Sequence, residues 1–359
     1  MIEEELRAAF ARQEALVPDT EPVRAAIDRI AVRRRRRRHT IRSAGAALAV
    51  LAVVAVPVVG RNLSATPTPA ESLTGAPAAP VVVPDRALNV LLLGADGQPG
   101  SDTGYRADTV LIVHVPRDRG QVYFVSMPRD LGIDIPGHGF GKLNEAFHLG
   151  STRPGGAVDL TAGARLTART LTGLGAPAFD ATAVLTFDGL RKLTDAVGGV
   201  RVCLPKRVPS QHTGRVFPAG CQRLDGAGAL DLLRQRYGLP LGAHDRDRNA
   251  QRFGAALLAE LTDAGTVTNP VRLSKILQTV GDGLATDTGG TSLVELLPVL
   301  AELAGAQTTG IGWEMSAAPS AGPVYQALDP VVSGSLFAAL HADTLAEWVG
   351  RHPERITPR

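Results

Sequence analysis

The chain has 359 residues, of which 44% are hydrophobic and 20% are charged. This composition is typical of a globular protein and excludes wholesale disorder, a collagen-like fibre and a disulfide-rich miniprotein. Residues 1–42 contain 11 arginines and 7 acidic residues, which leaves 27 basic and 28 acidic side chains in the rest of the chain. Because the bulk of the protein is nearly neutral, it has no basic field that would attract nucleic acid.

An apolar stretch, residues 43–60, has no charged side chain, and six consecutive arginines at 33–38 lie just before it. At about 1.5 Å per residue, a helix of this length spans roughly 27 Å, enough for the core of a bilayer. The positive-inside rule predicts that residues 1–42 are cytoplasmic and that everything after Arg61 is exported. A cleaved signal peptide and a nucleic-acid patch are alternatives. The long charged segment before the apolar stretch favours an uncleaved, single-pass membrane anchor.

Residues 61–85 are rich in Pro, Ala, Ser and Thr and are predicted to form an extended extracytoplasmic tether. A folded domain is predicted for residues 86–350, with a C-terminal tail over 351–359. Within this domain, β-rich runs predict strands over 88–93, 109–115, 121–126, 182–187 and 199–204. Helical patterns cover 143–149, 157–171, 189–197, 227–235 and 248–263. This alternation predicts an α/β fold, a central mixed sheet flanked by helices in an α/β/α sandwich.

Charged and polar residues fall at the ends of these predicted strands and at helix starts. They are Asp96, Arg106, Asp108, Arg129, Asp130, Lys142, Asn144, Arg234, Arg236, Asp245, Asp247, Arg248 and Arg252. Such positions tend to meet along one edge of an α/β sheet, where these folds bind ligands. Arginines grip phosphate bidentately, and carboxylates bind Mg²⁺. The set therefore predicts a phosphorylated substrate and a divalent metal.

One tripeptide, Pro-Arg-Asp, occurs twice, at 116–118 and at 128–130. The first copy lies in what the pattern predicts to be a hairpin turn. The second follows an apolar strand. We predict that the second copy is the functional one.

Six blocks in order carry a resemblance to a known family: LNVLLLGAD, YRADTVLIVHV, VYFVSMPRDLGIDIPGHGFGKLNEAF, LTFDGLRKLTDAVGGVRVCLP, LDGAGALDLLRQRYG and HDRDRNAQRF. Over residues 86–350 the chain resembles the LytR-CpsA-Psr (LCP) family. The resemblance implies an enzyme that transfers a glycopolymer from a polyprenyl-(pyro)phosphate carrier to a peptidoglycan hydroxyl, leaving a phosphodiester link.

The resemblance also implies roles for individual residues. Asp96 and Asp108 match the paired aspartates that bind Mg²⁺. The predicted substrate-binding residues are Arg106, Arg129, Lys142, Asn144, Arg234, Arg236, Arg248, Gln251 and Arg252. The late family motif reads R-x-x-R-Q, whereas here Gln251 precedes Arg252. Arg106, Asp108, Arg129 and Asp130 are the predicted catalytic residues, with Asp108 or Asp130 as the acceptor of the hydroxyl proton.

Cys203 and Cys221 flank a loop after the strand predicted at 199–204. In an exported domain we expect them to form a disulfide, which the family resemblance also fits. Two free thiols are expected only if the topology is reversed.

Three functions are compatible with these features to different degrees. The leading hypothesis is a membrane-anchored, Mg²⁺-dependent glycopolymer–peptidoglycan phosphotransferase, with the membrane as a partner and no nucleic acid. The alternative is a non-catalytic exported module that binds polyprenyl phosphate. A DNA-binding regulator would need the arginine run and the folded domain in one compartment, which the predicted membrane span forbids.

Overall fold

The computed structural model describes residues 84–97, 105–263, 265–289, 293–313, 316–317 and 325–358. The predicted cytoplasmic segment (1–42), membrane span (43–60) and all but the last residues of the tether (61–85) lie outside the described residues. Within the described ranges, no helix combines the length and the apolar character needed to cross a membrane.

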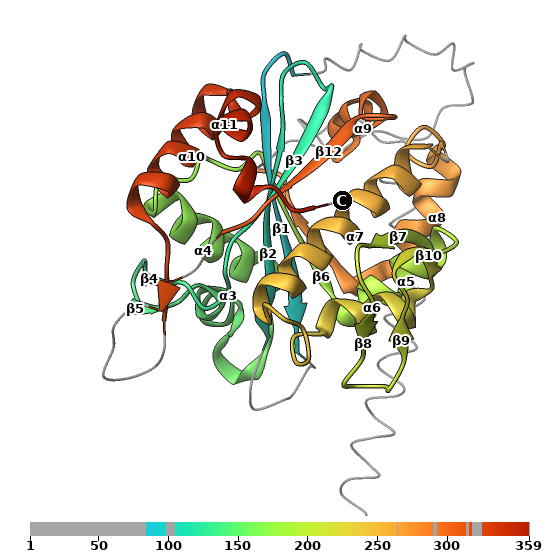
Figure 1. The fold of residues 1–359 in the computed structure, drawn as a ribbon, viewed down its shortest axis with the longest axis horizontal. Helices are drawn as coiled ribbons and strands as arrows, with labels where there is room; N and C mark the ends of the chain where they lie inside the picture. Colours follow the sequence, from blue (N-terminus) through green and yellow to red (C-terminus); the bar gives the residue numbers. More distant parts are fainter. Residues whose placement is uncertain are drawn as a thin grey trace, which may run out of the picture. The chain divides into compact units, whose positions relative to one another are not determined.

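The centre of the domain is a six-stranded mixed sheet in the order β11–β6–β1–β2–β3–β12 (Figure 1). Its strands are β1 (Leu88–Asp96), β2 (Arg106–Val115), β3 (Gln121–Ser126), β6 (Ala181–Thr186), β11 (Leu284–Asp287) and β12 (Gln307–Ile311). β1, β2 and β3 pair antiparallel, whereas β6 runs parallel to β1 and β12 runs parallel to β3. Four of the five predicted strands are therefore in the sheet.

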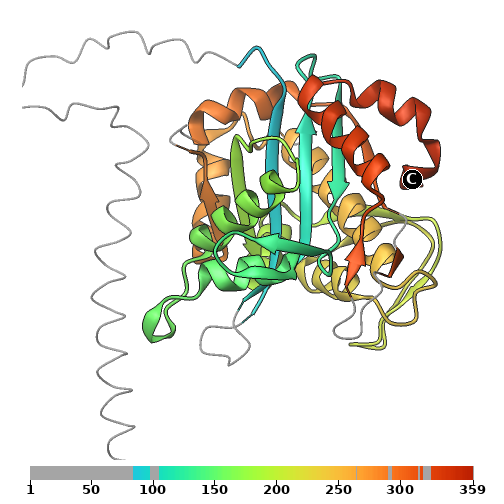
Figure 2. The ribbon, with the colours of Figure 1, turned by 90° about the vertical axis from the view of Figure 1, so that its left-hand side faces the viewer.

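Two layers of helices cover the sheet (Figures 1 and 2). One layer contains α3 (Leu143–Ser151), α4 (Leu160–Gly173), α10 (Pro330–Ala342) and α11 (Leu345–Arg351). The other contains α5 (Phe187–Ala196), α6 (Gly226–Arg234), α7 (Ala243–Asp263), α8 (Pro270–Val280) and α9 (Leu293–Glu302). The predicted α/β/α sandwich is confirmed.

Side chains alternate between the two layers along the central strands, as a strand buried on both faces requires. On β1, Leu91 and Leu93 are buried in the core that includes α3, α4 and α10. Val90 and Leu92 on the same strand pack against the core formed with α7 and α9. The continuous apolar run of β1 is explained by this two-sided burial.

Helix starts follow from local chemistry. Asp159, Thr186, Asp225, Asn269 and Asp329 are the N-caps of α4, α5, α6, α8 and α10, and each side chain accepts a hydrogen bond from a backbone N–H of the first turn. Such caps satisfy amide groups that have no partner within the helix.

Short hairpins complete the fold. The predicted fifth strand, β7 (Val200–Leu204), is not in the central sheet; it pairs with β10 (Gly220–Leu224) in a separate ribbon. Cys203 and Cys221 lie directly opposite each other in this ribbon and form the expected disulfide. The segment between them contains a smaller hairpin, β8 (Val208–Pro209) with β9 (Val216–Phe217).

The C-terminal residues differ from the prediction. Residues 351–358, expected to be a tail, pack onto the domain: Ile356 forms a bridge with Ile311, and the buried Thr357 hydroxyl donates to Oε1 of Gln251 at 2.5 Å. A second difference is that α7 begins at Ala243, five residues before the predicted start. The charged cluster 245–248 is therefore inside the first turns of the helix rather than ahead of it.

Candidate active site

The site begins with an irregularity in the pairing of β1 with β2. Gly94 is opposite Thr109, but Ala95 is opposite Ala107, so Asp108 is an extra residue on β2. Such a bulge changes the direction of a side chain and is frequent next to active sites. Here Asp108 lines the same cavity as its neighbour Thr109, which strict alternation along a strand would forbid.

Gly94 lies where little space is left for a side chain. A Cβ atom there would lie 3.0 Å from the Cβ of Thr109. The bulge thus brings the two strands close together where β1 ends in Asp96, and it places Asp96 and Asp108 on the same cavity wall.

Asp108 is the first member of a chain of ion pairs. Its Oδ1 accepts a hydrogen bond from Nη1 of Arg129 at 2.6 Å, and Nε of Arg129 lies 3.3 Å from Oδ2 of Asp130. Nζ of Lys142 donates to Oδ1 of Asp130 at 3.0 Å. The four side chains are largely shielded from solvent, with exposed fractions between 19% and 26%. Ion pairs therefore connect β2, the loop after β3 and the start of α3 at one end of the sheet.

The pKa values of two aspartates shift in opposite directions. Burial, together with the charge of Asp108, raises the pKa of Asp96, although Arg234 and Arg129 oppose the shift. Burial would also raise the pKa of Asp130, but its hydrogen bond to Lys142 and the charge of Arg129 outweigh burial and lower it. Asp130 is therefore a weak proton acceptor, whereas Asp96 carries repulsion that a bound cation would relieve.

An apolar cavity of about 580 Å³ opens from this cluster. It lies between the sheet and the layer that contains α5, α6, α7 and α9, and its lining runs along β2 from Asp108 to Val115. The seven steps from Asp108 to Val115, at about 3.3 Å each, span roughly 23 Å. Its wall is mostly aliphatic and includes Val90, Leu92, Leu111, Val113, Phe124 and Leu303. A long apolar channel with a charged mouth suits an amphiphile with a linear hydrocarbon chain.

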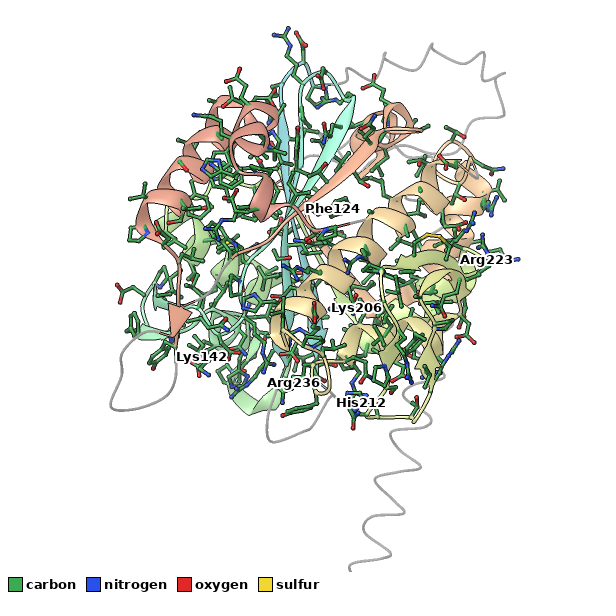
Figure 3. The ribbon with its side chains drawn as sticks, viewed as in Figure 1. Phe124, Lys142, Lys206, His212, Arg223 and Arg236 are labelled. Atoms are coloured by element: carbon green, nitrogen blue, oxygen red, sulfur yellow. A yellow bond between two sulfur atoms is a disulfide. The ribbon has the colours of Figure 1, made fainter. Side chains whose placement is uncertain are left out.

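Three arginines from other elements line the mouth of this channel: Arg234, Arg236 and Arg246. The guanidinium of Arg234 lies over the ring of Phe187, with Cζ 5.3 Å from the ring centroid. Arg236 stacks in the same way on Tyr237 at 4.6 Å. Figure 3 shows Lys142, Arg236 and His212 toward the lower end of the molecule, whereas Phe124 lies near its middle. The mouth therefore combines several cations with the two carboxylates Asp96 and Asp108.

Some predicted site residues do not line this mouth. Arg106 is exposed at the start of β2, directly opposite Asp96. Arg248 contacts Asp245 at 3.6 Å and lines a separate small pocket on the other side of α7. Nη2 of Arg252 donates to the carbonyl of Pro358.

Gln251 and Asn144 are buried close to this region. Gln251 is 2% exposed; its Nε2 donates to Oγ of Ser126 and to the carbonyl of Ile311. With Thr357 bonded to its Oε1, Gln251 ties α7 to β3, to the end of β12 and to the C-terminal residues. The backbone N–H of Asn144 donates to the carbonyl of Arg129, and its Oδ1 is buried without a hydrogen-bond partner among the described residues.

Arg246 and His212 line the mouth but were missed in the sequence. Arg246 is 4% exposed and pairs with Asp247 at 3.1 Å. Once α7 is known to begin at Ala243, helical spacing places Arg246 on the same face as Ala250 and Phe253, which would have identified it. His212 comes from the loop of the β8–β9 hairpin, and no sequence signal marks it.

A metal would have two carboxylates at this mouth. No group of three or more His, Cys, Asp or Glu side chains is placed to hold a metal within the part of the chain that the structure describes. Asp96 and Asp108 would suffice to hold Mg²⁺, because this ion is usually bound by one or two carboxylates together with waters and substrate phosphates.

Comparison with known proteins decides the family. The LytR_cpsA_psr family model matches residues 65–317. The chain belongs to this family. The LcpA cell wall biosynthesis protein of Corynebacterium glutamicum is 30% identical over 261 residues, which is 63% of this chain and 49% of that protein. The probable cell wall biosynthesis protein LcpB of the same organism is 35% identical over 214 residues, covering 54% of this chain and 48% of LcpB.

A third relative of this LytR_cpsA_psr chain carries an enzymatic name. The polyisoprenyl-teichoic acid–peptidoglycan teichoic acid transferase TagU of Oceanobacillus iheyensis is 30% identical over 215 residues, 59% of this chain and 62% of TagU. The chain spans about half the length of the two Corynebacterium relatives.

Solved structures share the fold. TagV of B. subtilis superposes with a TM-score of 0.58 at 18% identity, covering 73% of this chain and 98% of TagV. TagT bound to LIIa-WTA gives a TM-score of 0.56 at 22% identity, covering 72% of this chain and 91% of TagT. At these identities the likeness extends to the fold alone.

Proposed function

We propose that this protein transfers a glycopolymer from a polyprenyl-(pyro)phosphate carrier to a hydroxyl of peptidoglycan. The observation that carries the proposal is the apolar channel that opens at a cluster of arginines and aspartates. A polyprenyl pyrophosphate has this same division between a long hydrocarbon and a multiply charged head. The relative TagU, named as a polyisoprenyl-teichoic acid–peptidoglycan teichoic acid transferase, supports the same assignment.

The arginines would hold the phosphates. Arg234 and Arg236 approach the mouth from the end of α6, and Arg129 approaches from the loop after β3. Guanidinium groups bind phosphate oxygens bidentately, so cations on two sides fix the orientation of the head group. They also offset the negative charge that develops when the phosphoryl group is transferred.

We assign Asp96 and Asp108 to Mg²⁺. When bound, the ion supplies charge neutralisation on the phosphate oxygens. The protein's own contribution is the bulge that brings both carboxylates to one wall, with Arg129 holding Asp108 in place.

In the reaction, the acceptor oxygen forms a bond to the phosphorus that carries the glycopolymer. The bond from this phosphorus to the polyprenyl-phosphate oxygen breaks, and the polyprenyl phosphate leaves with the bonding electrons. The acceptor hydroxyl proton passes to a carboxylate. We assign this role to Asp108 rather than Asp130, because Asp108 lines the cavity whereas Asp130 does not, and because the pKa of Asp130 is lowered.

Membrane attachment is part of the proposal. A lipid-linked donor requires the domain to lie at a bilayer, which the predicted span over 43–60 and the predicted tether would achieve. We propose a single-pass topology with a cytoplasmic N-terminus and an extracytoplasmic domain. A reporter fused after residue 358 should be active only outside the cytoplasm. Activity of the reporter in the cytoplasm would overturn this topology.

Turnover of a polyprenyl-pyrophosphate-linked saccharide by the full chain in detergent tests the function. We expect release of polyprenyl phosphate that depends on Mg²⁺ and is lost in Asp108→Ala and Arg129→Ala. Arg117→Ala, in the other Pro-Arg-Asp copy, is the matched control and should keep wild-type turnover. Tight binding of the lipid without turnover at any Mg²⁺ concentration would refute the enzyme and leave a lipid-binding module.

A further inference from the structure

A pair of aromatic side chains lies next to the charged cluster and takes no part in the channel. The hairpin of β4 (Gly132–Ile135) and β5 (Gly139–Lys142) carries Phe140, which is 60% exposed. Among the described phenylalanines it is the only exposed one. Its ring lies edge-on to that of Tyr325, with centroids 5.1 Å apart and planes at 68°.

The two faces of this hairpin are chemically distinct. Ile133 and Ile135 point inward and are buried in the core that includes α3 and α4. Phe140 and Lys142, two residues apart on β5, share the outer face. In register, Phe140 is opposite the exposed Asp134, and Lys142 is opposite Gly132. The outer face therefore combines an aromatic surface with one carboxylate and one ammonium group.

Gly132 lets the aromatic pair lie against the backbone. A Cβ atom at this position would be 2.8 Å from Cζ of Phe140 and 3.0 Å from Cβ of Tyr325. The segment that carries Tyr325 is fixed by a hydrogen bond from the Gln326 N–H to the carbonyl of Asp130 at 2.9 Å. The platform is thus attached to the same residue that joins Lys142 to Arg129.

The platform is close to the proposed reaction centre and lies across the sheet from the channel. Phe140 and Lys142 lie two steps apart along β5, roughly 6.6 Å, about the width of a sugar ring. The hairpin packs on α3 and α4, whereas the channel lies on the layer of α5, α6 and α7 (Figure 1). In-line phosphoryl transfer places the attacking and leaving oxygens on opposite sides of phosphorus.

We propose that the exposed ring of Phe140, supported by its edge-on contact with Tyr325, is a stacking platform for a sugar ring of the acceptor glycan, an inference that rests on the proposed function. The faces of a pyranose ring carry C–H bonds and are apolar, so they can pack on the electron-rich, apolar face of an aromatic ring. Asp134 and Lys142 would bind the hydroxyls at the ring's edge. With the donor's hydrocarbon chain in the channel, the acceptor approaches from the hairpin side.

Binding of a soluble glycan to the full chain in detergent tests the platform directly. The probe is a β-1,4-linked tetramer of N-acetylglucosamine, and saturation-transfer NMR gives its Kd without any turnover. We expect Phe140→Ala and Tyr325→Ala to weaken binding at least tenfold and Phe140→Trp to restore it. Val271→Ala, at a side chain 78% exposed on α8, is the matched control and should bind as wild type.

Kinetics separate the acceptor from the donor. We expect Phe140→Ala to raise the KM for the glycan acceptor while leaving donor hydrolysis by water unchanged. An unaltered tetramer Kd in Phe140→Ala, or no tetramer binding by wild type, would overturn the inference. A rise in donor KM alone would also overturn it and assign the platform to the donor sugar. Tetramer binding through Phe140 in a chain that never turns over the donor would refute the proposed function and leave the sugar platform standing.

Discussion

The two Pro-Arg-Asp copies have identical side chains and opposite environments. In residues 116–118, Arg117 pairs with Asp85, and both side chains are more than 60% exposed. Oδ1 of Asp118 accepts a hydrogen bond from the N–H of Gly120 within the β2–β3 turn. In residues 128–130, Arg129 and Asp130 are 19% and 24% exposed and belong to a chain of ion pairs.

The difference comes from where each copy leaves the sheet. The first copy is at the tip of a hairpin, where solvent screens its charges. The second follows β3 at the end where β1 carries Asp96 and β2 carries its bulge. Charges that are shielded from solvent interact more strongly and shift each other's pKa values. We therefore assign the proposed chemistry to the second copy because of its neighbours and not because of its sequence.

We expect the largest effect on turnover from replacing Asp108, the ion-pair partner of Arg129 in the second copy. We expect Asp108→Asn to lower turnover about 10³-fold, since it removes a metal ligand and the proposed proton acceptor. Donor turnover at saturating Mg²⁺ measures the effect. The control is Asp118→Asn, which should keep wild-type turnover; equal losses in the two variants would break the comparison.

Replacing the arginine of each copy by methionine sharpens the comparison further. Arg129→Met should lower turnover about 10²-fold, because the head group loses a cation that stabilises the transferred phosphoryl charge. Arg117→Met should leave both turnover and Tm as in wild type, since its ion pair is exposed. If Arg117→Met lowers turnover as much as Arg129→Met does, the second copy is not the special one.

The Lys142–Asp130 pair predicts a pH-dependent effect on stability. A carboxyl whose folded pKa is lowered contributes stability above its unfolded pKa of about 3.9 and loses it as the pH falls through the folded value. We expect Lys142→Met to be less stable at pH 7 by up to about 1 kcal/mol. The difference in urea midpoint should close below about pH 4. A difference independent of pH would show that Lys142 contributes through packing.

Asp96 predicts a smaller effect of opposite sign. Its raised pKa means that the charged carboxylate destabilises the fold, so stability falls as the pH rises through that pKa. Without metal, Asp96→Asn should therefore raise Tm at pH 7 by about 2 °C. Adding Mg²⁺ should stabilise the wild type and not the variant. A lower Tm for the variant in the absence of metal would contradict this assignment.

Much of the fold could be predicted because short apolar runs and turn residues carry local signals. The strands around residues 88–126 and the helices of the first two-thirds of the domain appear where expected, within a few residues. The start of α7 was placed too late, because its first turns are charged. The strand predicted at 199–204 is present, but it pairs with β10 and not with the central sheet. The local sequence of a strand does not specify which strand it pairs with.

The site was predictable in residue type more than in arrangement. Asp96, Asp108, Arg129, Arg234 and Arg236 do meet at one cavity mouth. Arg248, Gln251 and Arg252 follow in the same sequence block as Arg246, but a helix distributes neighbours over all its faces. Arg246 and Gln251 lie on different faces of α7. Arg246 therefore lines the cavity, whereas Gln251 hydrogen-bonds to the ends of β3 and β12.

The sequence by itself determined the family, the α/β class and the identity of the charged residues, because these depend on local composition and ordered motifs. Tertiary structure alone decided that Asp108 turns into the cavity and that Phe140 and Tyr325 meet over Gly132. Both depend on strand register and on contacts between distant segments. Such contacts are fixed only when the whole sheet pairs and packs, so no short window of sequence contains them.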